Sequence, residues 1–402
     1  MPPIPFAPAG REDVVRLAEL QMLADAGMPN DWAKSVEDFF SAKGNHTGYS
    51  LSTWQRTPWY GPIDTYMRRG KDITDILIDG DGLPISVVTR GILSDTGVVP
   101  HPSWTAFVQR QLLLRSQTTA PQQEQLDDWR DEKHRPTHRV DGSCDRRFRY
   151  CITRAPLTPD GPTVAVRVIP EAWSTITDLV HESAQILTRE AVSFLLDAIR
   201  HGVTVLISGV TGSGKSTIGA ALLQAIGDEK RTIIIEQARE LPKPRMGFSM
   251  EVGGSGGLSF AACVYAALRM RPDMIVVGEV RGAEALAMLQ AAATGHAGIA
   301  TIHGGTPKVA LSNLERMACE AGEIPPTSVR GMIASAAIPM LVMQVVRAGG
   351  RRRVTEIAEV IPAGASGKLG DEFPTNPIFA TNAAGALARS GSVSAAWGKG
   401  RY

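Results

Sequence analysis

The stretch GVTGSGKST, at residues 209–217, constrains the fold of this chain more than any other part of its sequence. It fits the pattern G-x-x-x-x-G-K-[ST] at every fixed position. An apolar run suited to a buried strand, 203–207, precedes it, and a run of helix-forming residues, 218–223, follows it. Glycines let backbone N–H groups turn towards phosphate oxygens, and the helix that follows presents its positive end to them. The stretch therefore predicts a phosphate-binding loop between a strand and a helix.

The chemistry of this loop indicates ATP bound together with Mg²⁺. We expect Lys215 to reach the β- and γ-phosphates and the Ser216 hydroxyl to bind Mg²⁺. An ordinary glycine-rich turn before a helix is the alternative, but the strand and the helix that a phosphate loop requires are both in place. The predicted nucleotide-binding residues are Gly209, Val210, Thr211, Gly212, Ser213, Gly214, Lys215, Ser216 and Thr217.

Apolar strands alternate with helices in the part of the chain that holds the loop. The strands are expected at 203–208, 232–236, 274–278 and 299–303, and a hairpin-like strand at 351–361. Such alternation predicts an α/β domain with a mostly parallel sheet and helices on both faces.

The remaining sequence predicts a smaller α/β domain and three connecting or terminal segments. Strands are expected at 73–78, 85–88, 148–153 and 163–169, and a helix at 104–115. The predicted organisation is a helical extension over 1–58, the smaller α/β domain over 59–169, a linker over 170–187, the P-loop domain over 188–362 and an unstructured tail over 363–402.

Composition excludes several classes of protein. With 42 basic and 41 acidic residues, the net charge of +1 gives no global attraction to nucleic acid or anionic lipid. The four cysteines lack zinc-site spacing and are expected to be reduced thiols. The N-terminus lacks the pattern of a signal peptide, and the longest apolar run, 332–346, is shorter than a membrane span needs. We therefore expect a cytoplasmic protein, attached to a membrane at most through partners.

A single acid follows the apolar run Met274–Gly278, which suits a buried strand. Ligands of parallel sheets lie at the carboxyl ends of the strands, where this acid, Glu279, is expected. We expect Glu279 to orient the attacking water and to support Mg²⁺ through its bound water. A surface acid at a strand end is the alternative, which the presence of the P-loop disfavours.

Further polar residues lie at the ends of predicted strands. Glu236 ends an apolar run, and Glu240 follows it, so a second acidic cluster near the γ-phosphate is a hypothesis. His296 and His303 bracket the strand around Ile299 and could sense the γ-phosphate or orient Glu279. Structural roles remain open for all four residues, because strand ends often carry acids and lone histidines are usually structural.

Taken together, these motifs resemble the secretion and traffic ATPases, which drive type II and type IV secretion, pilus assembly and conjugation. The resemblance covers about 60–362 and rests most on the P-loop, on LRMRPD at 268–273, on GEVRG at 278–282 and on TGHAGIATIH at 294–303. Within the family the chain looks most like the Flp-pilus (CpaF-like) and conjugal-transfer (TrbB-like) ATPases.

The resemblance implies roles for individual residues. Lys215 and Ser216 match the Walker A positions, and Glu279 matches the Walker B glutamate. The acidic box is matched by Glu236 and Glu240, with Gln237 in place of the usual Asp, and the histidine box by His296 and His303, with Gly304-Gly305 where relatives often carry Ala-Asn.

The resemblance also implies a RecA-like P-loop domain in a homo-oligomeric ring, a hexamer in such families, whose N-domains contribute arginines to the bound nucleotide. Arg167 matches the family's strand arginine. Arg146 and Arg147 are further candidates, although Cys144-Asp145 disturbs the expected spacing. Such a protein would work with secretion or pilus platform proteins at the inner face of the cell membrane.

Three functions compete at this point: a secretion motor, a DNA-translocating or helicase-like ATPase, and a small-molecule kinase. DNA tracking calls for basic or aromatic elements, but the only dense basic run, Arg351–Arg353, reads as a solvated strand end. A kinase would need an arginine-rich lid, whereas 242–257 is glycine-rich. The motor is therefore preferred, and nucleic acid is not expected to be a direct ligand.

Overall fold

The computed structural model places most of the chain between residues 60 and 394. It describes 72–89, 91–100, 137–144, 147–169, 174–181, 185–227, 229–236, 241–252, 259–335, 337–348, 351–362 and 373–394, together with isolated residues between 60 and 113. The predicted helical extension over 1–58 lies outside the described residues. The chain forms two compact units, Met1–Glu171 and Ala172–Tyr402, each with its own core.

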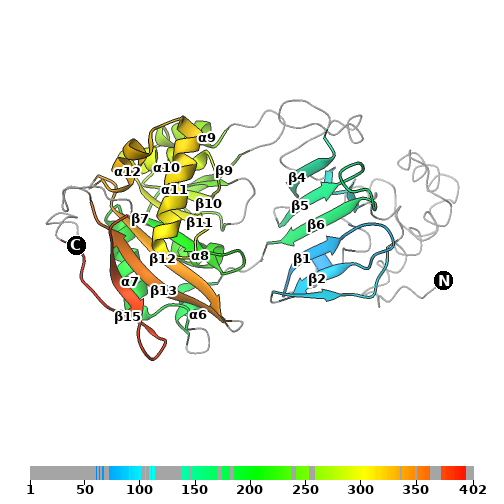
Figure 1. The fold of residues 1–402 in the computed structure, drawn as a ribbon, viewed down its shortest axis with the longest axis horizontal. Coiled ribbons are helices and arrows are strands. Elements are labelled where there is room, and N and C mark those ends of the chain that lie inside the picture. The colour runs from blue at the N-terminus through cyan, green and yellow to red at the C-terminus, as the bar shows by residue number, and fades with distance from the viewer. Residues whose placement is uncertain are drawn as a thin grey trace. The chain divides into compact units, whose positions relative to one another are not determined.

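The first unit contains a six-stranded antiparallel sheet in the order β3-β2-β1-β6-β5-β4 (Figure 1). Its strands are β1 (Ile73–Ile78), β2 (Ser86–Thr89), β3 (Ile92–Asp95), β4 (Arg139–Cys144), β5 (Phe148–Thr153) and β6 (Thr163–Val168). Alternate residues such as Ile76, Ile152 and Val166 are buried in one core, and their neighbours form the other face. The described residues between 105 and 113 are helical, in agreement with the helix predicted there.

The second unit is built on a nine-stranded sheet in the order β15-β14-β13-β12-β7-β11-β10-β8-β9. The strands are β7 (Thr204–Gly209), β8 (Thr232–Glu236), β9 (Gly247–Glu251), β10 (Met274–Val280), β11 (Ala297–Ile302), β12 (Met340–Ala348), β13 (Arg351–Val360), β14 (Thr375–Thr381) and β15 (Leu387–Arg389). The pairs from β12 to β9 are parallel, and those from β12 to β15 are antiparallel. The prediction of a mostly parallel sheet is confirmed.

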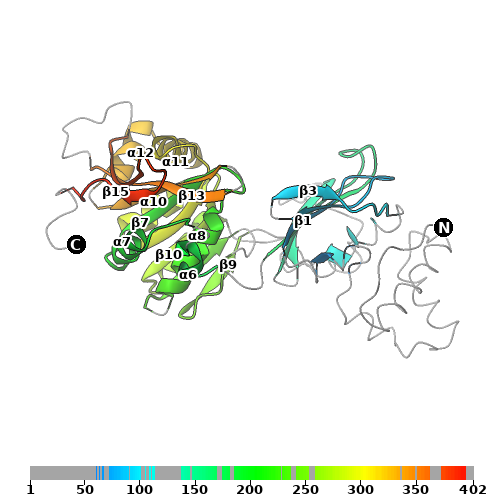
Figure 2. The same ribbon diagram turned by 90° about the horizontal axis from the view of Figure 1, so that it is seen from below.

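Helices lie on both faces of this sheet (Figures 1 and 2), and a hydrophobic core lies on each face. Val205 and Ile207 of β7 pack in the core formed with α7 (Arg189–Arg200) and α8 (Lys215–Ile226). Leu206, between them, packs in the opposite core. That core contains α9 (Phe260–Leu268), α10 (Glu284–Ala293), α11 (Pro307–Gly322) and α12 (Pro326–Ile333). Central strands buried on both faces explain the continuous apolar runs of the sequence.

The segment predicted as a linker, 170–187, largely belongs to the second unit. Within it, α6 (Ile176–Val180) begins with a capping box between Thr175 and Asp178. Leu179 and Leu187 are buried in the same core as α7 and α8. The backbone N–H of Val354 also donates to the carbonyl of Ile186 at 3.0 Å. Apolar side chains that find a core therefore hold most of this segment in place.

The prediction of an unstructured tail over 363–402 is wrong for the described residues 373–394. There β14 and β15 extend the sheet beyond β13. Phe379 is fully buried against Phe194 of α7, with ring centroids 5.5 Å apart, and the Arg389 guanidinium lies over both rings. A few large apolar residues spaced among Gly, Ala and Ser were enough to order the segment.

We expect Phe379→Ala to lower the free energy of unfolding of the second unit by about 3 kcal/mol, because it removes a buried aromatic ring and leaves a cavity. Val309→Ala, at an exposed position of α11, is the matched control and should change it little. Urea unfolding followed by circular dichroism measures both. Equal midpoints for the two variants would mean that β14 contributes nothing to the core.

Candidate functional site

The glycine-rich loop connects the end of β7 to the start of α8, as predicted. Gly212 and Gly214 have φ angles of 73° and 103°, in the region that favours glycine. A Cβ on Gly209 would lie 2.4 Å from the carbonyl oxygen of Val345 and 2.5 Å from Ser213 Oγ. Gly209 thus permits the close approach to β12, and Gly212 and Gly214 adopt backbone conformations that other residue types rarely take.

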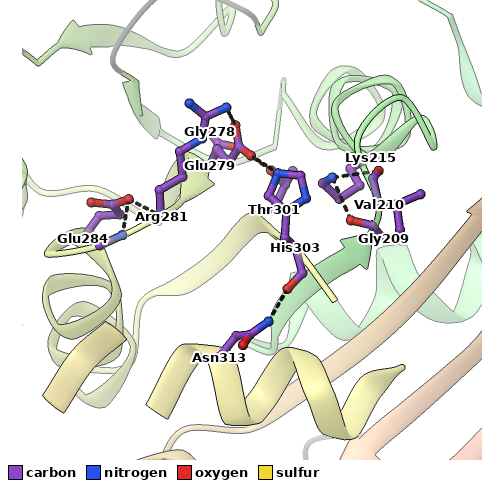
Figure 3. A network of polar contacts seen from close by, with 11 residues as sticks. Gly209, Val210, Lys215, Gly278, Glu279, Arg281, Glu284, Thr301, His303 and Asn313 are labelled. Carbon is purple, nitrogen blue, oxygen red and sulfur yellow. Dashed lines mark hydrogen bonds and ion pairs between the residues drawn. The ribbon is translucent and has the colours of Figure 1, made fainter. Parts of the chain in front are cut away.

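Lys215 lies at the first position of α8 and is 6% exposed. Its Nζ donates to the carbonyl oxygens of Gly209, at 2.9 Å, and Val210, at 3.2 Å (Figure 3). Burial lowers the pKa of Lys215, and the negative charge of Glu279 opposes that shift. The ammonium group is therefore held inside the loop, in the field of the Glu279 carboxylate.

The loop fits a phosphate ligand on two observations. The Ser213 hydroxyl is fully buried and has no hydrogen-bond partner among the described residues. Ser216 and Thr217 lie partly exposed in the first turn of α8, where helix N–H groups lack partners within the helix. An anion at this point would receive backbone donors and the Lys215 charge, so the residues suit a nucleotide, with Ser216 available for its Mg²⁺.

Glu279 lies near the end of β10 and makes two contacts with cationic or protonatable groups (Figure 3). His303, directly after β11, places its Nε2 at 2.8 Å from Glu279 Oε1. Arg281 forms an ion pair with Glu279 Oε2. Because β7, β11 and β10 run parallel to one another, this carboxylate and the P-loop lie at the same edge of the sheet.

The surroundings keep Glu279 ionised. Burial opposes ionisation and is the largest single influence, but Arg281, together with His303 and Lys215, outweighs it, so that the pKa of Glu279 is lowered. A carboxylate that is charged at neutral pH and only partly exposed can accept a hydrogen bond from a water molecule and polarise it. Sequence reasoning assigned no role to Arg281, although the GEVRG motif contains it.

Glu236, at the end of β8, is buried directly beneath Gly278. A Cβ on Gly278 would lie 2.8 Å from Glu236 Cγ. The glycine before Glu279 therefore makes room for Glu236, and the first predicted acid does lie beside the site. Glu240 lies outside the described residues.

His296 does not lie beside Glu279, and its predicted role in sensing nucleotide stays a prediction. His296 directly precedes β11, and its Nδ1 lies 2.8 Å from Thr294 Oγ1. The six residues of β11 span about 20 Å, so His296 and His303 lie at opposite edges of the sheet. Only His303 reaches the edge that carries the P-loop.

Buried polar residues hold the loop after β11. Ser208 Oγ and Gln344 Nε2 donate to the carbonyl oxygen of Gly304 at 3.2 and 3.1 Å, and Asn313 Nδ2 donates to the carbonyl of His303 at 2.8 Å. A Cβ on Gly304 would lie 2.7 Å from Ser208 Oγ. The glycine that departs from the family pattern thus permits this close packing and fixes the backbone of His303.

The predicted N-domain arginines belong to the first unit. Arg167 of β6 is half exposed and pairs with Asp75 of β1 at 3.0 Å. Arg149 of β5 is its partner on the other side, so Arg149, Arg167 and Asp75 form a row across three strands. Sequence reasoning missed Arg149. The guanidinium of Arg147 stacks on Phe148, and Arg146 lies outside the described residues.

Within the described part of the chain, no group of three or more His, Cys, Asp or Glu residues could hold a metal ion. The four cysteines are free, as expected.

Comparison with known proteins gives the family. Residues 133–365, more than half of the chain, match the family model described as type II/IV secretion system protein. The chain belongs to this family. A putative conjugal transfer protein of Mycobacterium tuberculosis (strain ATCC 25618 / H37Rv) is 34% identical over 211 residues, which are 50% of this chain and 58% of that protein. The conjugal transfer protein TrbB of Rhizobium radiobacter is 31% identical over 204 residues, 50% of this chain and 61% of TrbB.

These matches span less than two thirds of the relatives' own length. The type IV secretion system protein VirB11 of Bartonella quintana, for example, is 32% identical over 46% of this chain and 55% of VirB11. Among solved structures, the pilus retraction motor PilT with bound ADP is similar at 22% identity and a TM-score of 0.51, over 73% of this chain and 80% of PilT. The predicted RecA-like fold and the resemblance to secretion proteins, TrbB among them, are confirmed; the CpaF-like assignment stays a prediction.

None of the described helices is both long and apolar enough to cross a bilayer.

The packing of Glu236 beneath Gly278 gives a prediction about stability. Gly278→Ala should lower the free energy of unfolding by about 1–3 kcal/mol, because the new methyl group must displace the buried Glu236 side chain. At Gly282 the nearest contact of a Cβ is 3.9 Å away, so Gly282→Ala is the matched control and should have little effect. Chemical denaturation of both variants measures the difference, and equal stabilities would contradict this account.

Proposed function

We propose that this protein is a Mg-ATP-hydrolysing motor of a secretion, pilus-assembly or conjugal-transfer machine. The observation that carries the proposal is the common sheet edge shared by Lys215 in the P-loop and by Glu279, which contacts His303. A loop that only binds phosphate needs Lys215 but not Glu279. Hydrolysis also needs a group that polarises water, and Glu279, two strands away and kept ionised, can supply it.

Each residue has a distinct part in this proposal. Lys215 would compensate the charge that develops on the β- and γ-phosphates, and Glu279 would orient the attacking water and polarise it. His303 would hold the Glu279 carboxylate in position through its Nε2. When bound, Mg²⁺ neutralises phosphate charge; Ser216 would be its protein ligand, and Glu279 would reach it through water.

Coupling of hydrolysis to work would use the arginines of the first unit. On the side of Glu279, the described part of the P-loop unit provides Lys215 and Arg281, and Arg281 is engaged with Glu279. We infer that Arg167 completes the charge around the phosphates, with Arg146 and Arg147 as further candidates. A ring of subunits, hexameric by family resemblance, would bring these groups into register, and closure of the first unit on nucleotide would be the working movement.

The relatives suggest where the motor works. TrbB is named for conjugal transfer, VirB11 for type IV secretion and PilT for pilus retraction. By analogy, we propose that this chain acts at the inner face of the cell membrane and docks on platform proteins of such a machine. Its near-zero net charge favours protein partners over nucleic acid.

Two substitutions test the catalytic assignment. Lys215→Ala should abolish phosphate release and weaken ATP binding, because it removes the cation inside the loop. Glu279→Gln should still bind ATP but should lower kcat by about 100-fold or more, because it keeps the shape and loses the charge that polarises water. Phosphate release and a nucleotide titration are measured on the same preparations.

The wild-type protein and Cys319→Ser, at a free and half-buried thiol away from the loop, serve as controls. Wild-type rates in Lys215→Ala would remove the P-loop from the mechanism. Loss of ATP binding in Glu279→Gln, together with loss of turnover, would mean that Glu279 is structural.

Arg167→Ala tests the contribution of the first unit. We expect the variant to fold, because Arg167 is exposed and its ion pair with Asp75 adds little stability, and to lower turnover by about 1,000-fold. Arg139→Ala removes an exposed arginine paired with Asp141 in the same unit and is the matched control.

Sedimentation with and without a non-hydrolysable ATP analogue tests the ring. Assembly should increase with the analogue, because a ligand stabilises the state that binds it. A monomer with the same specific activity at every protein concentration would rule the ring out, and full activity in Arg167→Ala would rule out that arginine.

A further inference from the structure

Arg352 lies beside the P-loop, although it is distant from the loop in sequence. It is the second residue of β13, and it pairs in register with Arg347 of β12. Val345 of β12 pairs in turn with Gly209, the last residue of β7. Arg352 therefore lies just beyond the end of β7, at the level where the P-loop begins.

The side chain of Arg352 packs on the loop itself. A Cβ on Gly214 would lie 2.9 Å from Arg352 Cδ and 3.6 Å from its Nε. Gly214 precedes Lys215 and caps α8 with a φ of 103°. The absence of a side chain at Gly214 thus leaves room for the arginine stem, and it brings the guanidinium to the mouth of the phosphate-binding turn.

The guanidinium of Arg352 is half-buried, and within the described part of the chain neither an ion pair nor a hydrogen bond holds it. Burial lowers the pKa of Arg352, and repulsion from Arg347 lowers it further. Two arginines facing each other across a strand pair destabilise the fold unless an anion lies nearby. A half-buried cation in such surroundings is suited to a charged ligand that the chain itself does not provide.

The strand order says which end of a nucleotide this arginine meets. Glu279 and His303 lie on the β11 and β10 side of β7, and Arg352 lies on the β12 and β13 side. The γ-phosphate is the one attacked by water, so it lies on the side of Glu279. If the triphosphate crosses the loop from that side, its other end, the α-phosphate, lies next to Arg352.

We propose that Arg352 binds the α-phosphate of the nucleotide held by its own chain. This inference rests on the proposed function and adds a second cation, on the far flank of the loop from the reacting phosphate. Because the α-phosphate is present in ATP and ADP and does not react, Arg352 contributes to the affinity for both nucleotides and not to the chemical step.

Nucleotide titrations of Arg352→Ala test the assignment. The Kd values for ADP and for a non-hydrolysable ATP analogue should both rise by about ten-fold or more and by the same factor, as expected for loss of a charge-assisted hydrogen bond. KM for ATP should rise in parallel while kcat changes little. Arg351→Ala, at the exposed neighbouring position, is the matched control and should leave all of these values unchanged.

Arg352→Lys keeps a cation on a long stem, so it should fold as the wild type does and recover part of the affinity. Unchanged Kd values in both Arg352 variants, with normal binding in the wild type, would overturn the proposal and leave the proposed function intact. A loss confined to the ATP analogue would overturn it as well, because the guanidinium would then meet the γ-phosphate. If neither the wild type nor Lys215→Ala bound nucleotide, both this proposal and the proposed function would be overturned.

Discussion

The parallel pairing of β7, β11 and β10 is the constraint on which the rest of the site depends. Three strands running in the same direction bring the ends of three apolar runs to one edge of the sheet. That edge receives the P-loop after β7, His303 after β11 and Glu279 near the end of β10. Because each strand is buried on both faces, a shift in register would move apolar residues between two different cores. The packing of the strands in the two cores therefore fixes the positions of the polar groups at the strand ends.

The site also depends on the close approach of backbone segments to their neighbours. Gly209 and Gly304 each lie where a Cβ would meet another atom within 2.7 Å, and Gly278 makes room for a buried carboxylate. The polar residues Ser208 and Gln344 then tie β7 and β12 to the turn after β11. Glycines and buried hydrogen bonds together hold the loop backbones in a geometry that larger side chains would prevent.

Most of the central sheet could be predicted because burial on both faces leaves a direct mark on the sequence. The predicted strand at 232–236 coincides with β8, and those at 73–78 and 148–153 coincide with β1 and β5. Edge and half-exposed strands leave a weaker mark, so β4, with its polar residues and glycine, and β9, half-exposed throughout, were missed. The buried strand β12 was missed for another reason: the apolar run at 332–346 covers both the end of α12 and most of this strand. In the tail, the order comes from contacts of Phe379 with a helix almost 200 residues earlier, which no local pattern contains.

The contrast between local patterns and long-range contacts also separates the predicted site residues from the missed ones. Lys215, Ser216 and Glu279 lie at or after the ends of strands in the sequence, so local patterns were sufficient to propose them as site residues. His303 was proposed in the same way, whereas His296 lies at the other end of the same strand and so at the opposite edge of the sheet. Arg352 could not be found locally, because only the pairing of β12 with both β7 and β13 brings it to Gly214.

The charges at this edge are arranged so that a triphosphate would meet complementary groups along its whole length. Lys215 makes hydrogen bonds to two neutral carbonyl oxygens, and a phosphate oxygen would give this ammonium stronger, charge-assisted partners. Glu279 is negatively charged and would repel the γ-phosphate if Arg281 did not compensate that charge. The ion pair with Arg281, together with the contact to His303, thus lets one carboxylate remain ionised close to a polyanion. The basic residue two positions after Glu279 therefore has a physical reason in this chain: without Arg281, burial and a nearby phosphate would both favour the protonated form of Glu279, which cannot polarise water.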